Sequence, residues 1–302
     1  MIDFTGLPKK NKSYAGANGS KISVVYEGEQ YMLKFPPHPS KNEKMSYSNS
    51  CISEYLGCRI FESVGIPVQD TMLGTYMTEK SGEKVVVACK DFTSVGIVLQ
   101  DFASLKNQII DSERNGYGTE LGDIVSVFAE QTAVEPEELS RRFWDMFIVD
   151  ALIGNWDRHN GNWRFLYDVQ KDSLTLAPVF DCGSSLFPQA DERMMENILT
   201  DEREIHHRIF NIPQSAIQKN GRKINYYEFI SSLENEDCNR ALGRILPRVD
   251  MKRIAEIINE TPVISDLQKE FYKKMLTARK EHILDYSIKR LHKREKSRSM
   301  ER

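Results

Sequence analysis

The chain has 302 residues, of which 40% are hydrophobic and 28% are charged, and its formal net charge is -3. This is the composition of a soluble globular protein, and no run approaches the roughly 18 consecutive apolar residues that a membrane span needs. The length allows either two ordinary domains or one enzyme that is built as two lobes.

The cysteines and the amino terminus indicate a protein of the reducing cytoplasm. The five cysteines stand at irregular separations without a C-x-x-C pair, so we expect free thiols and neither structural metal nor a disulfide framework. Residues 1–12 lack the apolar stretch and the cleavage pattern of a signal peptide, so any export would use another route.

Residues 1–92 are expected to form a small β-rich lobe. Apolar and polar residues alternate in residues 22–35, which predicts a hairpin with its turn at residues 27–30. Residues 50–64 repeat apolar residues at helical spacing and end at Gly65. The stretches "TMLGTYM" and "KVVVACKDF" then predict a second hairpin. The lobe would hold about five strands around one helix.

The pattern changes to helices after this lobe, which predicts a larger helical lobe at residues 93–302. Pro136 opens a helix with an apolar side, and this helix leads into residues 154–165. After Asp181 we expect helix nearly to the end of the chain. The clearest helical segments there are residues 226–234, 251–260 and 267–291. The predicted fold class is therefore α+β, with a small β-rich lobe and a larger α-helical lobe.

A basic run closes the chain. Residues 289–302 carry seven Lys or Arg side chains against two Glu side chains. A solvated helix end is the plain interpretation, and a patch for nucleic acid, membrane or nuclear import is the alternative. Because short basic runs are common, we do not expect a nucleic-acid partner.

Small residues precede the first hairpin in the stretch "SYAGANGSK". They would let backbone N–H groups approach phosphate oxygens, and they are Gly16, Ala17, Asn18, Gly19 and Ser20. The stretch is not a Walker-type phosphate loop, because G-x-x-x-x-G-K-[ST] is missing and a strand follows it. An ordinary polar turn is the alternative for this segment taken alone.

Lys34 lies in the second strand between Leu33 and Phe35, where a lone cation would be costly to desolvate. It therefore needs an anionic partner. ATP phosphates would provide one, and Glu54 on the following helix would hold the ammonium group, as the strand lysine and helix glutamate do in protein kinases. A place on a solvated face is the alternative for each residue.

The stretch "GNWDRHNGNWRF" at residues 154–165 gathers polar residues after a helix. Asp157 and Asn162 have the D-x-x-x-x-N spacing of a kinase catalytic loop, which puts a carboxylate near the attacking hydroxyl. Downstream, an apolar run that we expect to be a strand ends at Asp181 in a D-C-G sequence, the form of a D-F-G metal site. Because Mg²⁺ favours one or two carboxylates with phosphate oxygens and waters, Asn162 and Asp181 are the predicted metal ligands.

These motifs, in this order, resemble those of the HipA family of bacterial serine/threonine kinases over nearly the whole chain. The stretches that carry the resemblance are "AGANGSK", "YMLKFP", "SEYLGCRIFESVGIPV", "DALIGNWDRHNGNWRFL" and "LAPVFDCGSSL". The resemblance implies a two-lobed, protein-kinase-like fold that is shared with phosphoinositide kinases. It also implies ATP with Mg²⁺ as cofactors and transfer of the γ-phosphoryl group to serine or threonine of proteins, including the enzyme itself.

The resemblance implies a role for each site residue as well. Asp157 would be the catalytic base. Beside it, and apart from the resemblance, we expect His159 to hold the loop by a hydrogen bond to the backbone, with direct contact to the γ-phosphate as the alternative. Lys34 would bind phosphate, while Asn162 and Asp181 would hold the metal. The backbone that joins the lobes would hold adenine somewhere in residues 88–91, with Ala88, Cys89 and Lys90 as the candidate residues.

Three classes of function compete. A serine/threonine protein kinase is favoured by the family resemblance, whereas the pattern D-R-H-N-x-N, which also occurs in phosphoinositide kinases, keeps a lipid or other small-molecule acceptor as the alternative. A catalytically inactive interaction protein is disfavoured, because the lysine and both metal-site motifs are present.

The resemblance also bears on self-phosphorylation and on location. Ser13 and Ser20 are candidate self-phosphorylation sites because they lie beside the predicted phosphate turn. The implied location is the bacterial cytoplasm, and effector members of the family suggest delivery into a host cell with host proteins as targets.

Overall fold

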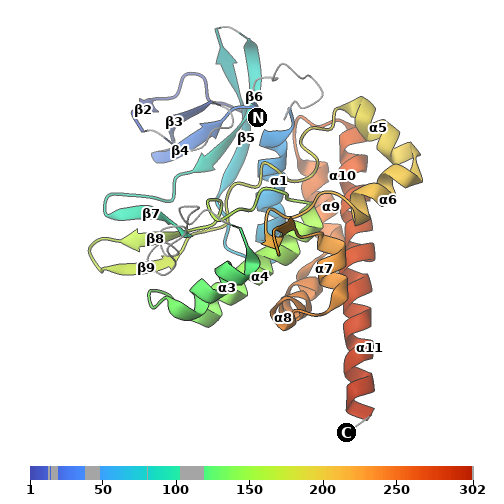
Figure 1. Cartoon of the computed structure of the whole chain (residues 1–302). Helices are drawn as coiled ribbons and strands as arrows, with labels where there is room; N and C mark the ends of the chain where they lie inside the picture. Colours follow the sequence, from blue (N-terminus) through green and yellow to red (C-terminus); the bar gives the residue numbers. More distant parts are fainter. Residues whose placement is uncertain (13, 15–19, 38–47, 80, 103–118, 301–302) are drawn as a thin grey trace.

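The computed structural model combines a large sheet, formed mostly by the amino-terminal third of the chain, with a part that is mainly helical (Figure 1). The structure describes all residues except 13, 15–19, 38–47, 80, 103–118 and 301–302. The α+β class that the sequence predicts is confirmed.

The large sheet has six strands in the order β1-β5-β6-β4-β3-β2. They are β1 (Ile2–Asp3), β2 (Lys9–Lys10), β3 (Lys21–Tyr26), β4 (Glu29–Lys34), β5 (Thr71–Thr78) and β6 (Gly82–Lys90). Both predicted hairpins are confirmed, as β3 with β4 and as β5 with β6. The edge strands β1 and β2 are too short to show an alternating pattern, so the sequence does not predict them.

Helix α1 (Ser50–Ser63) packs against β5 and β6. Leu56 and Phe61 are fully buried, so the apolar side of the helix holds it in place. Gly65 follows the helix with a φ of 74°, the left-handed conformation that glycine adopts after a helix end. The helix thereby brings Glu54 toward the end of β4.

A second sheet of three strands was not expected. Its order is β7-β8-β9, with β7 (Ile97–Asp101), β8 (Arg164–Asp168) and β9 (Ser173–Leu176). The expectation of helices from residue 93 onward is therefore wrong at β7. This strand pairs with one far along the chain, Ile97 lying opposite Asp168, so no local sequence pattern marks the pairing.

The strand that was expected to run to Asp181 ends at Leu176. Pro178 has no N–H to donate to a strand ladder, and the chain continues toward the site with a single bridge from Val179 to Val68. The apolar run reaches Asp181 as an irregular segment, and that part of the strand prediction is wrong.

Helix α4 (Pro136–Ile153) lies at the centre of the helical part, and all its residues from 143 to 153 are buried. It begins with the predicted proline and ends at Gly154, which has a φ of 66°. The other helices are α3 (Leu121–Glu130), α5 (Glu192–Thr200), α6 (Glu202–Phe210), α7 (Tyr226–Ser232), α8 (Glu236–Ile245), α9 (Met251–Glu260), α10 (Asp266–Arg279) and α11 (Tyr286–Met300).

The three helical segments predicted after Asp181 are confirmed as α7, as α9 and as α10 with α11, the last two joined by a π-helical segment (Lys280–Asp285). The expectation of helix nearly throughout is wrong at a short hairpin, β10 (Gln218–Lys219) with β11 (Arg222–Lys223). Its turn is an Asn-Gly pair in which both residues have positive φ, as a type I′ turn requires.

The described residues have three further features, which concern membrane spans, metal sites and cysteines. None of the helices they form has the length and apolar character to span a membrane. They contain no group of three His, Cys, Asp or Glu side chains arranged to hold a metal ion. The five cysteines are free and buried.

Candidate functional site

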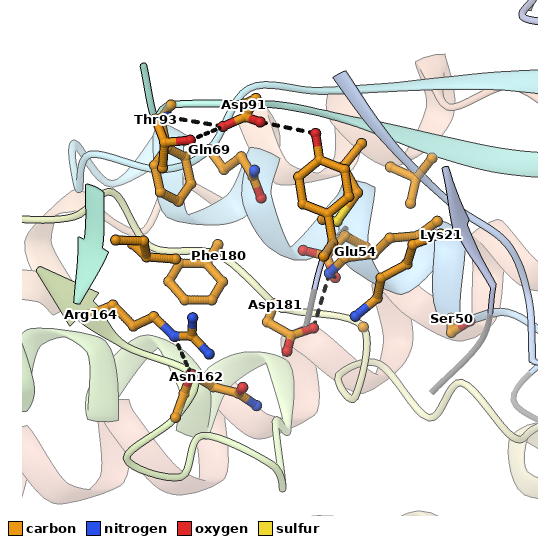
Figure 2. A pocket seen from close by; sticks show the side chains of 18 of the residues that line it. Lys21, Ser50, Glu54, Gln69, Asp91, Thr93, Asn162, Arg164, Phe180 and Asp181 are labelled. Atoms are coloured by element: carbon orange, nitrogen blue, oxygen red, sulfur yellow. Dashed lines mark hydrogen bonds and ion pairs between the residues drawn. The ribbon is translucent and has the colours of Figure 1, made fainter. Parts of the chain in front are cut away.

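One cavity of about 830 Å³ brings the predicted motifs together (Figure 2). From the large sheet it is lined by Lys21, Met32, Lys34 and Val87, and from the opposite side by Asp157, His159, Asn162 and Asp181. Its volume lies within the range of small-molecule sites, roughly 300–1,000 Å³.

Lys34 lies between two carboxylates at the floor of this cavity. Its Nζ is 2.8 Å from Oε2 of Glu54 and 3.0 Å from Oδ1 of Asp181. The Glu54 side chain is 1% exposed, whereas that of Asp181 is 43% exposed. The ion pair with Glu54 therefore fixes the ammonium group from behind, and Asp181 keeps part of its carboxylate open to the cavity.

The charges of this group stabilise one another. Burial opposes the charged form of Lys34, but Asp181 and Glu54 outweigh it and raise the pKa of Lys34 well above its ordinary value. Burial likewise opposes ionisation of Asp181, yet Lys34 lowers the pKa of Asp181 to about 2. Both groups are therefore charged at neutral pH.

Glycines allow α1 and the D-C-G segment to approach each other. A Cβ added at Gly57 would lie 2.6 Å from the Cβ of Cys182, and one added at Gly183 would lie 3.2 Å from Oε2 of Glu54. Asp181 itself has a φ of 58°, a left-handed conformation that aspartate tolerates better than most residues. The D-x-G motif therefore needs glycine at its third position, because this segment packs closely against α1.

The loop after Gly154 is held by its own polar groups. Asp157 N–H donates to Oδ1 of Asn155 at 3.0 Å, and Nδ2 of Asn162 donates to the carbonyl of Asp157 at 2.7 Å. Because the amide nitrogen of Asn162 is used inside the loop, its Oδ1 is the atom left for a ligand. Asn162 is labelled near Asp181 and Phe180 in Figure 2.

Asp157 is half-buried at the edge of the cavity. Burial, reinforced by the charge of Asp181, raises the pKa of the Asp157 carboxyl, while His159 and Arg158 act in the opposite direction. A carboxylate with a raised pKa is a stronger proton acceptor than an ordinary one.

Arg158 joins the two motifs, and we did not assign it a role from the sequence. Its Nε donates to Asp150 at 3.0 Å, and its Nη1 donates to the carbonyl of Asn162 at 2.9 Å and to that of Phe180. The side chain is 5% exposed. Arg158 therefore sets the distance between the loop and Asp181, and its place beside Asp157 is the signal that could have found it.

His159 lines the cavity and closes a turn of the loop. Its Nδ1 accepts a hydrogen bond from Gly161 N–H at 2.9 Å. A neutral imidazole whose Nδ1 is an acceptor carries its hydrogen on Nε2. The ring therefore holds the loop through one nitrogen and offers a donor through the other.

The expected adenine contacts at Ala88, Cys89 and Lys90 need correction. Ala88 and Cys89 lie inside β6, which pairs with β4 on one side and β5 on the other, so the sheet uses their backbone groups. Lys90 N–H donates to Asp70, and its carbonyl accepts from Gln69 at 2.8 Å. None of the three lines the cavity, whose lining on this side continues from Val87 to residues 91–94.

The turn predicted to hold phosphate is only partly described. Gly16, Ala17, Asn18 and Gly19 lie outside the described residues. Ser20 is exposed, and its carbonyl accepts from Phe35 N–H at 3.1 Å. Lys21, which lines the cavity, was not singled out from the sequence; burial and the charge of Lys34 lower its pKa.

The residues fit ATP with Mg²⁺. The amide oxygen of Asn162 and the open part of the Asp181 carboxylate are hard oxygen donors, as Mg²⁺ prefers. Such a site takes its remaining ligands from phosphate and water, so it does not need a cluster of three acidic or histidine side chains. Lys21 and Lys34 supply positive charge for phosphate oxygens, and the cavity has the volume for a nucleotide.

Comparisons with known proteins show the family to which the chain belongs. Residues 12–266 match the family model of the HipA-like C-terminal domain. The chain is 48% identical over 286 residues to the serine/threonine-protein kinase CtkA of Helicobacter pylori (strain J99), covering 94% of this chain and 86% of that protein.

The fold comparisons give the same relationship. The crystal structure of a Helicobacter pylori proinflammatory kinase, CtkA, matches with a TM-score of 0.89 and 46% identity, over 96% of this chain and 98% of that one. HipA in a toxin–antitoxin and operator DNA complex from Shewanella oneidensis MR-1 matches with a TM-score of 0.57 and 15% identity, over 93% and 68%. The second likeness shows the fold alone.

Proposed function

This chain belongs to the family of the HipA-like C-terminal domain and is a serine/threonine-protein kinase, and we propose that Asp157, Asn162 and Asp181 carry out its phosphoryl transfer. The observation that supports these roles most is the convergence of all three with Lys34 on one cavity of nucleotide size. As in kinases generally, ATP is the phosphoryl donor.

Lys34 and Glu54 would hold the phosphate end of ATP. The ion pair with Glu54 keeps the Lys34 ammonium group inside the cavity, where it can donate hydrogen bonds to phosphate oxygens. Adenine would lie against the backbone of residues 91–94, the first part of the connecting segment outside β6 that lines the cavity. Mg²⁺ held by Asn162 and Asp181 would neutralise charge on the phosphate groups.

Asp157 would orient the acceptor hydroxyl and accept its proton. Its raised pKa strengthens it as a base, and its hydrogen-bonded loop keeps it at a fixed distance from Asp181. His159 would keep the loop in shape and present Nε2–H to the cavity. In a loose phosphoryl-transfer transition state, positioning and charge of this kind are most of what a protein supplies.

Self-phosphorylation is part of the proposed activity. Ser20 is exposed next to β3 and is the described candidate, while Ser13 lies outside the described residues. Intact-mass measurement and peptide mapping after incubation with Mg-ATP would test this. Phosphate on other residues only, or on none, would contradict these two sites.

Host proteins are the acceptors that we propose beyond the chain itself. The Helicobacter pylori relative is described as a proinflammatory kinase, which suggests action on a host. Labelling of host-cell extract by wild-type protein, and not by Asp157→Ala, would support this. Labelling that is confined to bacterial proteins would count against it.

A direct test offers two acceptors in parallel: a generic protein substrate and phosphoinositide vesicles, each with labelled ATP and Mg²⁺. We expect the protein to be labelled, and Asp157→Ala and Asp181→Ala each to abolish labelling while the variants remain folded. Label in the lipid alone would establish the phosphoinositide alternative. Full activity in either variant would remove that residue from the mechanism.

A further inference from the structure

The hairpin of β10 and β11 carries three exposed cations, Lys219, Arg222 and Lys223. Lys219 and Arg222 are directly opposite each other in its register. Like charges at opposed positions of an antiparallel pair repel and destabilise it. The arrangement therefore favours an anion lying against the hairpin.

Among the described residues, a neighbouring carboxylate forms an ion pair with one of these three cations. Lys219 has a carboxylate near it, with its Nζ 3.6 Å from Oε2 of Glu234. Within the part of the chain that the structure describes, Arg222 and Lys223 form no ion pair closer than 4.0 Å. Both side chains are exposed and can meet a partner from outside.

The hairpin is held rigidly. The carboxylate of Glu120 accepts from Asn220 N–H at 2.8 Å and from Gly221 N–H at 3.0 Å, so it fixes both residues of the turn. The flanking residues Ile217 and Ile224 are buried and joined by a backbone hydrogen bond of 2.9 Å. Arg222 and Lys223 therefore belong to a hairpin that is held in place at its turn and at both of its ends.

A hydrogen bond connects the residue after this hairpin region, Tyr226, to the loop that carries Asp157. Tyr226, which follows the hairpin and is 1% exposed, donates its hydroxyl to the carbonyl of Asn155 at 2.5 Å. Asn155 in turn accepts from Asp157 N–H. Through Tyr226, the hairpin is thus joined to the loop that carries Asp157.

We propose that Arg222 and Lys223 recognise acidic side chains that flank the serine or threonine of the acceptor protein. This inference rests on the proposed function and names the class of substrate that the same site takes. Arg222 can bind a carboxylate through two parallel hydrogen bonds, and Lys223 adds a point charge. Because both side chains are exposed, the expected preference is modest and sensitive to salt.

A binding experiment tests the recognition without relying on catalysis. Two fluorescent peptides would share one serine and differ only in carrying Glu or Gln around it. We expect wild-type protein to bind the Glu peptide about 3- to 10-fold more tightly, with the preference shrinking as salt is raised. The double variant Arg222→Gln/Lys223→Gln should bind both peptides alike.

A matched control removes the same charge elsewhere. The double variant Lys296→Gln/Arg298→Gln lies near the end of α11, which extends away from the rest of the molecule in Figure 1, and it should keep the preference for the Glu peptide. Equal binding of both peptides by wild-type protein would overturn the proposal. So would an unchanged preference in the hairpin variant, or hairpin-dependent binding of phosphoinositide vesicles with no binding of the Glu peptide.

Transfer from labelled ATP to a generic protein, measured with the same preparations, separates this inference from the proposed function. Complete absence of transfer in wild-type protein would contradict the kinase mechanism. Normal transfer without any preference between the peptides would contradict only the recognition by the hairpin.

Discussion

Lys34 and Asp181 are 147 residues apart in the sequence, and their charged atoms are 3.0 Å apart in the structure. Lys34 comes from the end of β4, and Asp181 comes from the irregular segment after β9. Their ion pair joins the large sheet to the opposite wall of the cavity at the point where phosphate would bind. Several properties of the enzyme should depend on it and on the packing around it.

Replacing Lys34 should lower the free energy of unfolding, because Glu54 would stay buried without its ion-pair partner. Lys34→Met leaves a carboxylate that is 1% exposed without its partner, and we expect a loss of about 3 to 5 kcal/mol in the free energy of unfolding. The double variant Lys34→Met/Glu54→Gln should be more stable than the single variant. Urea unfolding would measure both, and strictly additive losses would contradict a coupled pair.

Gly57 should not tolerate a methyl group. In Gly57→Ala the new Cβ would lie 2.6 Å from the Cβ of Cys182, so α1 must shift away from the D-C-G segment. We expect a loss of about 1 to 3 kcal/mol together with weaker transfer.

The control is Gly243→Ala in α8, where an added Cβ meets nothing within 4 Å. It should gain about 0.5 to 1 kcal/mol, because alanine favours a helix. Equal behaviour of the two variants in thermal unfolding would show that the close approach at Gly57 is unimportant.

Arg158 should act as a positioning residue. Arg158→Lys keeps the charge but cannot reproduce the separate hydrogen bonds to Asp150, Asn162 and Phe180. We expect kcat to fall about 100-fold or more while the Kd for ATP changes little, because the loop is displaced relative to Asp181.

Arg253→Lys, which alters an exposed pair with Glu256, is the matched control and should keep its kcat. A kcat within about threefold of wild type for Arg158→Lys would show that the loop keeps its place without the guanidinium group.

Asp157 should lower stability at neutral pH while serving catalysis. Burial raises its pKa in the folded protein above the ordinary value, so the folded state binds more protons than the unfolded state between those two pKa values. The free energy of unfolding then falls as pH rises through that window. Asp157→Asn should therefore have a higher Tm than wild type at pH 7, and the difference should vanish in acid below the ordinary pKa. A lower Tm for the variant at pH 7 would contradict the sign.

Local patterns were enough to predict the main elements and some of the residues that meet in the cavity, among them Lys34, Asp157 and Asp181. Each of these patterns can be recognised within fewer than about 20 neighbouring residues. Examples are the hairpin of β3 and β4, the helix α4 and the D-x-x-x-x-N spacing. Lys34 stood out because a cation between Leu33 and Phe35 requires a partner. Glu54 is that partner in the structure.

Features that depend on distant segments were missed. β7 takes its partner from β8, and the three backbone and side-chain acceptors of Arg158 come together only after folding. The family resemblance implies adenine contacts at Ala88 and Cys89, but the sequence does not reveal that β6 has a strand on each side. The Asn220-Gly221 turn is different, since its sequence signal was present and was overlooked.

We propose that Asp157 acts on the acceptor hydroxyl and takes no part in holding ATP. The most direct measurement is to compare Asp157→Asn with wild type for the Kd of Mg-ATP, by calorimetry, and for the rate of transfer from labelled ATP to protein. We expect the Kd to stay within about threefold and the rate to fall by about 100- to 10,000-fold. Transfer at the wild-type rate in the variant would show that Asp157 is not the base.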